Sequence, residues 1–377
     1  MRPPAPPPPA VALRARPPDT TDRPIVTPTN SLARRRTLGA SLGLGDALFA
    51  SGEERGFARA IEAGLERVEA GLAEQLAFAD DIADATSRYL MDAGGKRVRP
   101  VLALLTAQLG EGITDEVVRA AQAVEITHVA SLYHDDVMDD AQVRRGVPSA
   151  QTVWGNSVAI LTGDLLFARA SKLIATLGER ALTLQANVFE RLCLGQLHET
   201  VGPRPDEDPI EHYLQVLSDK TGSLISCAAV VGVVFSHADE AYQPAVEEFG
   251  ERIGVAFQLI DDVIDLSTAI EETGKQAGTD LRAGVPTLPL LYLRREAETD
   301  AAAAALVERL EEGAAADDPA VFAAAVAELR DHPVTAATLA EANRWSDAAV
   351  AALAPLPQGP VKKSLTRFAQ AIVERSS

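Results

Sequence analysis

The stretch HVASLYHDDVMD, residues 128–139, places two carboxylates one helical turn apart at the end of an apolar run. Residues i and i+4 of a helix lie on one face, so Asp135 and Asp139 point in the same direction. The stretch FQLIDDVID, residues 257–265, repeats this pattern with Asp261 and Asp265. A single motif of this kind is more typical of a solvated acidic face. Two of them, each set in an apolar helix, instead predict a pair of cation-binding helix turns.

The chemistry of these carboxylates indicates which cation they bind. Like charges one turn apart destabilise a helix, and burial next to Leu, Ile and Val side chains adds a desolvation penalty. A bound cation offsets both. Mg²⁺ prefers one or two carboxylates together with phosphate oxygens and water. We therefore expect magnesium ions to clamp a diphosphate between the two helices.

The rest of the sequence, from Leu38 to the end, predicts helices over almost its whole length. From Leu38 onward, Ala, Leu, Glu and Arg are abundant and apolar residues recur at three- and four-residue spacing. One apolar stripe consists of Phe57, Ile61, Leu65, Val68 and Leu72, and a second begins at Leu76 and Ile82. The charge-free run 222–238 is short for a bilayer span, so we expect a buried core helix there, including its strand-like portion 230–235. Helix breaks are expected at 94–95, 202–203, 205, 209, 274 and 284–286, where Gly and Pro occur.

Composition excludes several classes of function. The chain has 377 residues, of which 47% are hydrophobic and 24% charged, as in globular proteins. Its net charge of −19 argues against a nucleic-acid partner, because a phosphate backbone would be repelled. Cys193 and Cys227 form no disulfide or zinc pattern, and no secretory signal is seen, which favours the reducing cytoplasm. Length alone would suggest two domains.

Residues 1–38 differ in kind from the rest of the chain. They hold ten of the 23 prolines, and seven Arg against Asp19 and Asp22 give them a net charge of +5, so the remainder carries −24. Such a segment buries too little apolar surface to offset the entropy of ordering, and we expect a disordered extension. An inert extension is favoured over one that docks on anionic lipid or on a partner. Residues 39–377 form the expected catalytic domain.

Basic residues suited to phosphate surround the two motifs in sequence. In GGKRVRP, residues 94–100, the glycines let the backbone approach a ligand, while Lys96, Arg97 and Arg99 supply donors. Arg144 and Arg145 follow the first motif, Lys220 and Thr221 precede the charge-free run, and Lys275 and Asp280 follow the second motif. Each alone could be a surface charge or a helix cap. Together, in this order, they indicate an anion site.

This ordered set resembles the trans-isoprenyl diphosphate synthases, also called polyprenyl synthetases, over roughly residues 38–377. The matching elements are GGKRVRP at 94–100, HVASLYHDDVMD at 128–139, RRG at 144–146, GDLLFARA at 163–170, KTGSLIS at 220–226, FQLIDDVID at 257–265 and KQAGTD at 275–280. The Pro-rich segment has no counterpart in the family pattern. The resemblance implies an all-α fold, a single large helical bundle around a central cavity, usually a homodimer. It sets aside the two-domain expectation, because both motifs must meet at one ligand.

The resemblance also implies roles for individual residues. The diphosphate of isopentenyl diphosphate would be held by Lys96, Arg97, Arg99, His128 and Arg145. The allylic diphosphate would be contacted by Arg144, Lys220, Thr221, Gln258 and Lys275. Mg²⁺ would be coordinated by Asp135, Asp139, Asp261 and Asp265, and the catalytic set would add Asp136, Asp262 and Lys220. No protein nucleophile is needed, because the reaction requires stabilisation of the departing diphosphate.

Product length is predicted from the helix that precedes Asp135. Ala130 and Ser131 lie about one turn before Asp135, and Thr127 about one turn further, each turn advancing about 5.4 Å. In the family, bulky aromatic side chains four and five residues before this aspartate stop chain growth early. Their absence predicts a long product, heptaprenyl to decaprenyl, for a quinone side chain. Tight packing of the small residues against a neighbour is the alternative, and Tyr133 should point elsewhere.

Other functions remain open at this point. They are a shorter-chain geranylgeranyl diphosphate synthase, a non-catalytic subunit of a heteromeric synthase, and a class I terpene cyclase. A cyclase usually pairs one aspartate-rich motif with a different metal site, and regulatory subunits tend to lose aspartates or the basic motif. Both sets look intact here. A peripheral membrane contact for product release is compatible with the resemblance.

Overall fold

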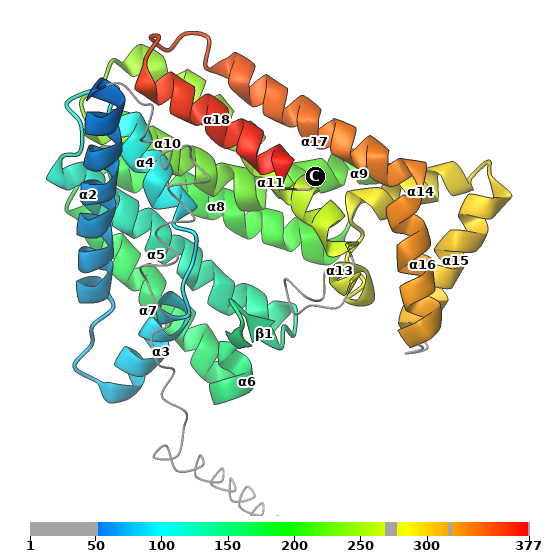
Figure 1. The fold of residues 1–377 in the computed structure, drawn as a ribbon. Helices are drawn as coiled ribbons and strands as arrows, with labels where there is room; N and C mark the ends of the chain where they lie inside the picture. The colour runs from blue at the N-terminus through cyan, green and yellow to red at the C-terminus, as the bar shows by residue number, and fades with distance from the viewer. Residues whose placement is uncertain (1–51, 268–276, 316–318, 376–377) are drawn as a thin grey trace, which may run out of the picture.

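Helices make up almost every element of this computed structural model, which describes residues 52–267, 277–315 and 319–375 (Figure 1). The longer helices are α2 (Gly52–Gln75), α3 (Asp81–Asp92), α4 (Val98–Ala107), α5 (Asp115–Met138), α7 (Asn156–Ala175), α8 (Glu179–Val201), α9 (Pro209–Leu217), α10 (Ser223–Phe235), α11 (Gln243–Asp265), α14 (Leu288–Ala297), α15 (Ala301–Ala315), α16 (Pro319–Asp331), α17 (Pro333–Ala352) and α18 (Pro360–Glu374). The short elements are strands β1 (Val143–Arg144) and β2 (Val147–Pro148), helices α6 (Ala150–Trp154) and α13 (Thr279–Arg282), the π-helical turn η2 (Ser218–Gly222) and the 3-10 turn η3 (Glu240–Tyr242). The expected all-α fold is confirmed.

Capping side chains and prolines explain where several helices begin. Asp80 caps α3 by accepting hydrogen bonds from the backbone N–H groups of residues 82 and 83, and Thr114 caps α5 in the same way. Asp208 caps α9, in which Pro209 occupies the first position, where a missing N–H is tolerated. Gly202, with φ 78°, ends α8. The predicted breaks at 94–95, 202–203, 205 and 284–286 lie outside helices, Pro209 instead begins α9, and Gly274 lies outside the described residues.

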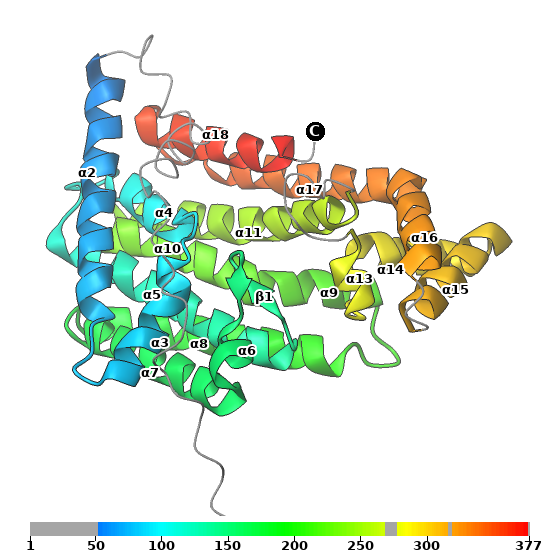
Figure 2. The same ribbon diagram turned by 60° about the horizontal axis from the view of Figure 1, so that its bottom comes forward.

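The main core lies where α4, α5, α10 and α11 pack together. Helix α5 packs against α7, α10 against α4 and α11, and α11 against α17. Turned by 60°, the molecule shows these helices as stacked layers, with α17 and α18 on one side and α7 on the other (Figure 2). A smaller apolar cluster is shared by helices α13, α14, α15 and α16. The carboxyl-terminal ends of α5 and α11 both lie toward β1 and α13 (Figures 1 and 2).

The charge-free run forms the buried helix α10, as predicted. Among the described residues, the continuous helical stretch 209–235 is long and apolar enough to cross a membrane, but 89% of its apolar window is buried inside the protein. The predicted stripe of α2 is also confirmed, because Ile61, Val68 and Leu72 are buried. Ile82 contradicts the pattern with 63% exposure, since it lies in the first turn of α3, away from the core. Residues 1–38 lie outside the described residues.

A short hairpin with a two-residue turn follows α5 and positions two arginines. Strands β1 and β2 pair antiparallel, with Arg144 opposite Val147. The two turn residues, Arg145 and Gly146, have φ of 54° and 78°. Positive φ at both central residues is what the tightest hairpin turn requires, and its twist matches that of the strands. The turn therefore brings Arg144 and Arg145 back toward the end of α5.

Candidate active site

The first aspartate motif lies at the carboxyl-terminal end of α5. Asp135 is half-buried and Asp139, which caps the helix, is exposed. Burial raises the pKa of Asp135 to about 6; Lys220 opposes this shift and Asp139 adds to it. Asp136 is fully buried, and its Oδ1 accepts a hydrogen bond of 2.6 Å from Arg144 Nε. The middle aspartate thus faces protein, while the outer two face the surface at the end of the helix.

The second motif repeats this arrangement at the end of α11. Asp262 is 5% exposed, and its Oδ2 accepts hydrogen bonds from Tyr213 Oη at 2.7 Å and from the Leu288 N–H at 3.3 Å. Burial raises the pKa of Asp262 to about 7, against the effect of these two donors. Asp261 Oδ1 lies 3.4 Å from Arg375 Nη2, and Asp265 Oδ2 accepts a hydrogen bond from the N–H of Asp280. Again the middle aspartate is held by other helices.

Lys220 and Glu199 form an ion pair beside the first motif. The Lys220 ammonium forms an ion pair with Glu199 of α8. Both charges influence the pKa of Asp135 and of Asp139, so the pair lies close to the first motif. Glu199 also raises the pKa of Tyr213, the partner of Asp262, after the larger effects of burial and of Asp262 itself. The pair therefore acts electrostatically on the first motif, and Glu199 also acts on the tyrosine that anchors the second.

The carboxylates of the two motifs fit a metal ion that takes most of its ligands from phosphate and water. Within residues 52–267, 277–315 and 319–375, no three His, Cys, Asp or Glu side chains are gathered as a preformed metal site. The outer carboxylates of each motif come in pairs, and burial disfavours the charged form of Asp135 until a cation approaches. Paired carboxylates with phosphate and water as further ligands suit Mg²⁺. The residues present therefore fit the expected ion.

A dense basic cluster surrounds His128. Burial lowers the pKa of His128 well below its ordinary value, and the charges of Arg99, Arg145, Arg144 and Arg97 lower it further, so the imidazole is neutral at pH 7. Burial also lowers the pKa of Arg99 and of Arg145 to about 10. Glu125, which is 2% exposed, is the carboxylate that opposes these shifts. The cluster has an excess of positive charge, as a diphosphate site requires.

Arg97 and Lys96 differ in their surroundings. Arg97 Nη1 lies 3.3 Å from Glu125 Oε1, and the residue adopts a left-handed φ of 51°. Its guanidinium is thus turned toward protein. Lys96 Nζ lies 5.8 Å from the ring centre of Phe257, and the Arg375 guanidinium lies 4.9 Å from the same ring. Burial lowers the pKa of Lys96, and the charge of Arg375 lowers it further.

The remaining predicted contacts are placed only in part. Thr221 is half-buried in η2, and Gln258 is half-buried on α11, one turn before Asp262. Lys275 lies outside the described residues. Neither Glu199 nor Tyr213 was predicted from the sequence. Both come from segments far from the aspartate motifs, and no local pattern marks them.

The predicted chain-length residues are buried on one side of α5. Thr127 and Ala130 are fully buried and Ser131 nearly so. Thr127 Oγ1 accepts a hydrogen bond of 2.9 Å from Gln185 Nε2, which places α8 across from this face. Tyr133 points elsewhere, as predicted, because its hydroxyl donates to the Thr86 carbonyl of α3. The wall near Asp135 is therefore made of small side chains.

Comparison with known proteins identifies close relatives. The model of the polyprenyl synthetase family matches residues 80–328. A nonaprenyl diphosphate synthase from Mycobacterium tuberculosis is 42% identical over 340 residues, covering 90% of this chain and 98% of that protein. A decaprenyl diphosphate synthase from Rhodobacter capsulatus has a TM-score of 0.76 at 33% identity, covering 85% of this chain and 98% of that one. A polyprenyl synthase from Caulobacter crescentus, solved with calcium and isoprenyl diphosphate, has a TM-score of 0.77 at 32% identity, covering 85% and 97%.

Proposed function

The chain belongs to the polyprenyl synthetase family, and we propose from this premise that it works as a magnesium-dependent, all-trans, long-chain polyprenyl diphosphate synthase. It is a prenyltransferase that condenses isopentenyl diphosphate with an allylic diphosphate. The observation that carries the assignment of the site is the repeated anchoring of the middle aspartate. Because Asp136 and Asp262 are held by protein, we assign metal and substrate binding to the outer aspartates of both motifs. Of these, Asp261 also pairs with Arg375 and Asp265 accepts a hydrogen bond from the N–H of Asp280.

The ion would be held by the outer carboxylates, Asp135, Asp139, Asp261 and Asp265. Bound there, Mg²⁺ supplies Lewis-acid stabilisation of the negative charge on the departing diphosphate. Asp136 and Asp262 orient the two helix ends rather than contact the ion. Protein residues that bind the same diphosphate would be Lys220, Thr221, Arg144, Gln258 and Lys275. Arg144 would reach it in a fixed orientation, because Asp136 holds its Nε.

The second substrate would bind at the basic cluster. Arg99, Arg145 and neutral His128, with Lys96, would hold the diphosphate of isopentenyl diphosphate. Arg97, engaged by Glu125, would hold the loop 94–100 in place. When the allylic C–O bond ionises, apolar walls keep water from the allylic cation until the isopentenyl double bond attacks. The released diphosphate then takes the proton, so no side chain acts as a nucleophile.

We propose that the product is long, heptaprenyl to decaprenyl, and serves as a quinone side chain. The small side chains of Thr127, Ala130 and Ser131 leave room for a growing chain along α5. The enzyme would work in the cytoplasm, with transient membrane contact to release its apolar product. A geranylgeranyl diphosphate synthase is the alternative that sizing of the product would reveal.

A second copy of this chain would cover the outer face of α7 and α8. Seven large hydrophobic side chains that are exposed among the described residues lie on these two helices: Ile160, Leu161, Leu182, Phe189, Leu194, Leu197 and Val201. Large apolar side chains gathered on the exposed surface of two adjacent helices are typical of an interaction surface. We propose a homodimer with two-fold symmetry, the commonest assembly of soluble proteins.

The assignment is tested with the purified chain alone. The chain is incubated with farnesyl or geranylgeranyl diphosphate, labelled isopentenyl diphosphate and Mg²⁺, and the products are sized. Each added unit contributes about five carbons, so heptaprenyl to decaprenyl products should contain about 35 to 50 carbons. Asp135→Ala and Asp261→Ala should each lower turnover by orders of magnitude at saturating Mg²⁺. No turnover by the wild-type chain would instead indicate a subunit that needs a partner, and near wild-type rates in both variants would refute the site.

A further inference from the structure

The π-helical turn η2 carries Lys220 and joins α9 directly to α10. The N–H of Ser223 donates to the carbonyl of Ser218, five residues earlier, instead of closing an ordinary α-helical turn. Such turns are rare inside helices and often occur at functional sites. The extra residue rotates the side chains of the turn relative to the helices on either side. Contacts from outside the turn therefore decide where Lys220 points.

Arg191 of α8 makes two of these contacts. Its Nε donates to Asp219 Oδ1 at 2.8 Å, and its Nη2 donates to Ser218 Oγ at 3.1 Å. The same guanidinium forms a two-point contact with Glu251 of α11, at 3.0 and 3.3 Å. Ser218 Oγ donates to Glu251 Oε1 at 2.6 Å, which closes the network. One side chain thus joins α8, the π turn and α11.

The charges of this network stabilise one another. Burial by itself would lower the pKa of Arg191 and raise that of Glu251. The hydrogen bonds between them, with those of Asp219 and Ser218, outweigh burial, so the pKa of Arg191 is raised and that of Glu251 is lowered. A two-point contact between guanidinium and carboxylate has a defined geometry as well as a favourable energy. The network therefore holds the turn in one position.

One face of α8 follows the turn over two helical turns. Arg191, Gly195 and Glu199 are spaced by four residues and so lie on the same face. A methyl group at Gly195 would lie 3.0 Å from the N and Cγ atoms of Lys220, closer than Cβ atoms usually pack, so glycine favours this approach. Glu199, one turn further, pairs with the Lys220 ammonium. Arg191 thus holds the base of the turn, and Glu199 holds the tip of its lysine.

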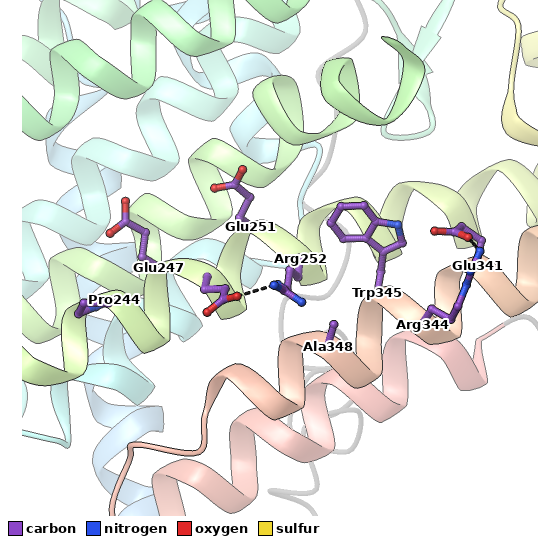
Figure 3. A pocket seen from close by; sticks show the side chains of 9 residues that line it. Pro244, Glu247, Glu251, Arg252, Glu341, Arg344, Trp345 and Ala348 are labelled. Carbon is purple, nitrogen blue, oxygen red and sulfur yellow. Dashed lines mark hydrogen bonds and ion pairs between the residues drawn. The ribbon is translucent and has the colours of Figure 1, made fainter. Parts of the chain in front are cut away.

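Helix α11 closes the turn from the opposite side. At Gly254, a methyl group would lie 2.6 Å from the Cα of Gly222, so the two backbones are in contact. Glu251 also lines a groove of about 680 Å³ between α11 and α17. In that groove the Glu251 side chain projects from α11 away from α17, which leaves its carboxylate to Arg191 (Figure 3).

We propose that Arg191 is a positioning residue for Lys220. By joining Ser218 and Asp219 to Glu251, it fixes the π turn and holds the lysine ammonium beside the first aspartate motif. The inference rests on the proposed function, which assigns the allylic diphosphate to Lys220. It predicts that loss of Arg191 affects the allylic substrate and not isopentenyl diphosphate, whose basic cluster is built on other helices.

The test compares Arg191→Met, Lys220→Met and the double variant in the full chain. KM is measured separately for the two substrates, and calorimetry measures binding of a non-reactive allylic thiolodiphosphate with Mg²⁺. Arg191→Met should raise the allylic KM about tenfold and weaken analogue binding equally, with the isopentenyl KM within about twofold of wild type. Arg191→Lys keeps the charge without the two-point contact, so its allylic KM and analogue affinity should lie between those of wild type and Arg191→Met. The double variant should be no worse than Lys220→Met, because both remove one interaction.

Arg180→Met is the matched control on the same helix. Arg180 pairs with Glu240 and Gln243 at 2.8 Å on the surface, away from the turn, so both KM values should stay unchanged. A lower melting temperature with equal changes in both KM values, or losses that multiply in the double variant, overturns the positioning role of Arg191. A normal allylic KM in Lys220→Met overturns the substrate assignment of Lys220 itself. The two failures are therefore distinguishable.

Discussion

Tyr213 Oη donates a 2.7 Å hydrogen bond to Asp262 Oδ2, across 49 residues of sequence. The middle aspartate of the second motif is thus held by α9 and, through the Leu288 N–H, by α14. Arg144 does the same for Asp136 in the first motif. Each motif therefore has one buried aspartate held by neighbouring protein groups and two outer aspartates at the helix end.

Tyr213→Phe should weaken the second metal site as well as the fold. The change leaves the buried Asp262 carboxylate with one fewer donor, which should lower the free energy of unfolding by about 1–3 kcal/mol. The Mg²⁺ concentration for half-maximal activity should rise. Urea denaturation and a Mg²⁺ titration measure the two effects. Tyr242→Phe, in the η3 turn, is the control, and an unchanged Mg²⁺ requirement in Tyr213→Phe would contradict the anchoring role.

The stability of the metal-free protein should depend on pH through Asp135 and Asp262. Burial raises their pKa values to about 6 and about 7, whereas an unfolded aspartate titrates near 3.9. The native state therefore binds more protons than the unfolded state between about pH 4 and pH 7, and their stabilising contribution is lost as pH rises through that window. Urea denaturation in a chelator should show a flatter pH dependence for Asp262→Asn than for wild type. Parallel curves for the two proteins would contradict the shift.

Arg144→Met should destabilise the protein by leaving Asp136 without its hydrogen-bond donor. Asp136 is fully buried, and Oδ2 already lacks a partner among the described residues, so the cost is about 1–3 kcal/mol. Adding Asp136→Asn removes the buried charge and should restore most of the stability. Activity should stay low in the double variant, because it lacks the guanidinium that we propose contacts the diphosphate. Thermal denaturation and turnover together check this; recovery of both would show a purely structural role.

Ala130→Phe should shorten the product. Ala130 is fully buried on α5 about one turn before Asp135, so an aromatic ring there would block the path of a growing chain. Overpacking should also lower stability by about 1–3 kcal/mol. Sizing of labelled products gives the answer, with Ala305→Phe on the exposed face of α15 as the control. The same product spectrum as wild type would argue that the chain does not grow along this face.

Charges on the outer face of α7 and α8 should separate the proposed dimer. Leu161 and Leu197 are 65% and 55% exposed, one on each helix. Glutamate at both positions should give a monomer by light scattering after size exclusion, because burying two carboxylates in an apolar interface is unfavourable. Val321→Glu, on the exposed side of α16, should leave the assembly unchanged. A double variant that stays dimeric would place the interface elsewhere.

Local patterns in the sequence predicted the helical fold and the paired aspartates. The stripe that contains Ile61, Val68 and Leu72 is buried because helical periodicity needs only neighbouring residues to express itself. The pattern failed at Ile82, where the first turn of a helix leaves the residue exposed. The i, i+4 spacing of Asp135 and Asp139 also follows from local geometry alone.

Only the tertiary structure decided which aspartates are buried and what holds them. Within each motif, three aspartates look alike in sequence, and their roles differ because Tyr213 and Arg144 arrive from other segments. The network of Arg191 and Glu251 around the π turn likewise joins residues 60 positions apart. The Tyr213 and Arg191 hydrogen bonds depend on how helices pack against one another, and that packing brings together side chains that no short spacing along the chain relates.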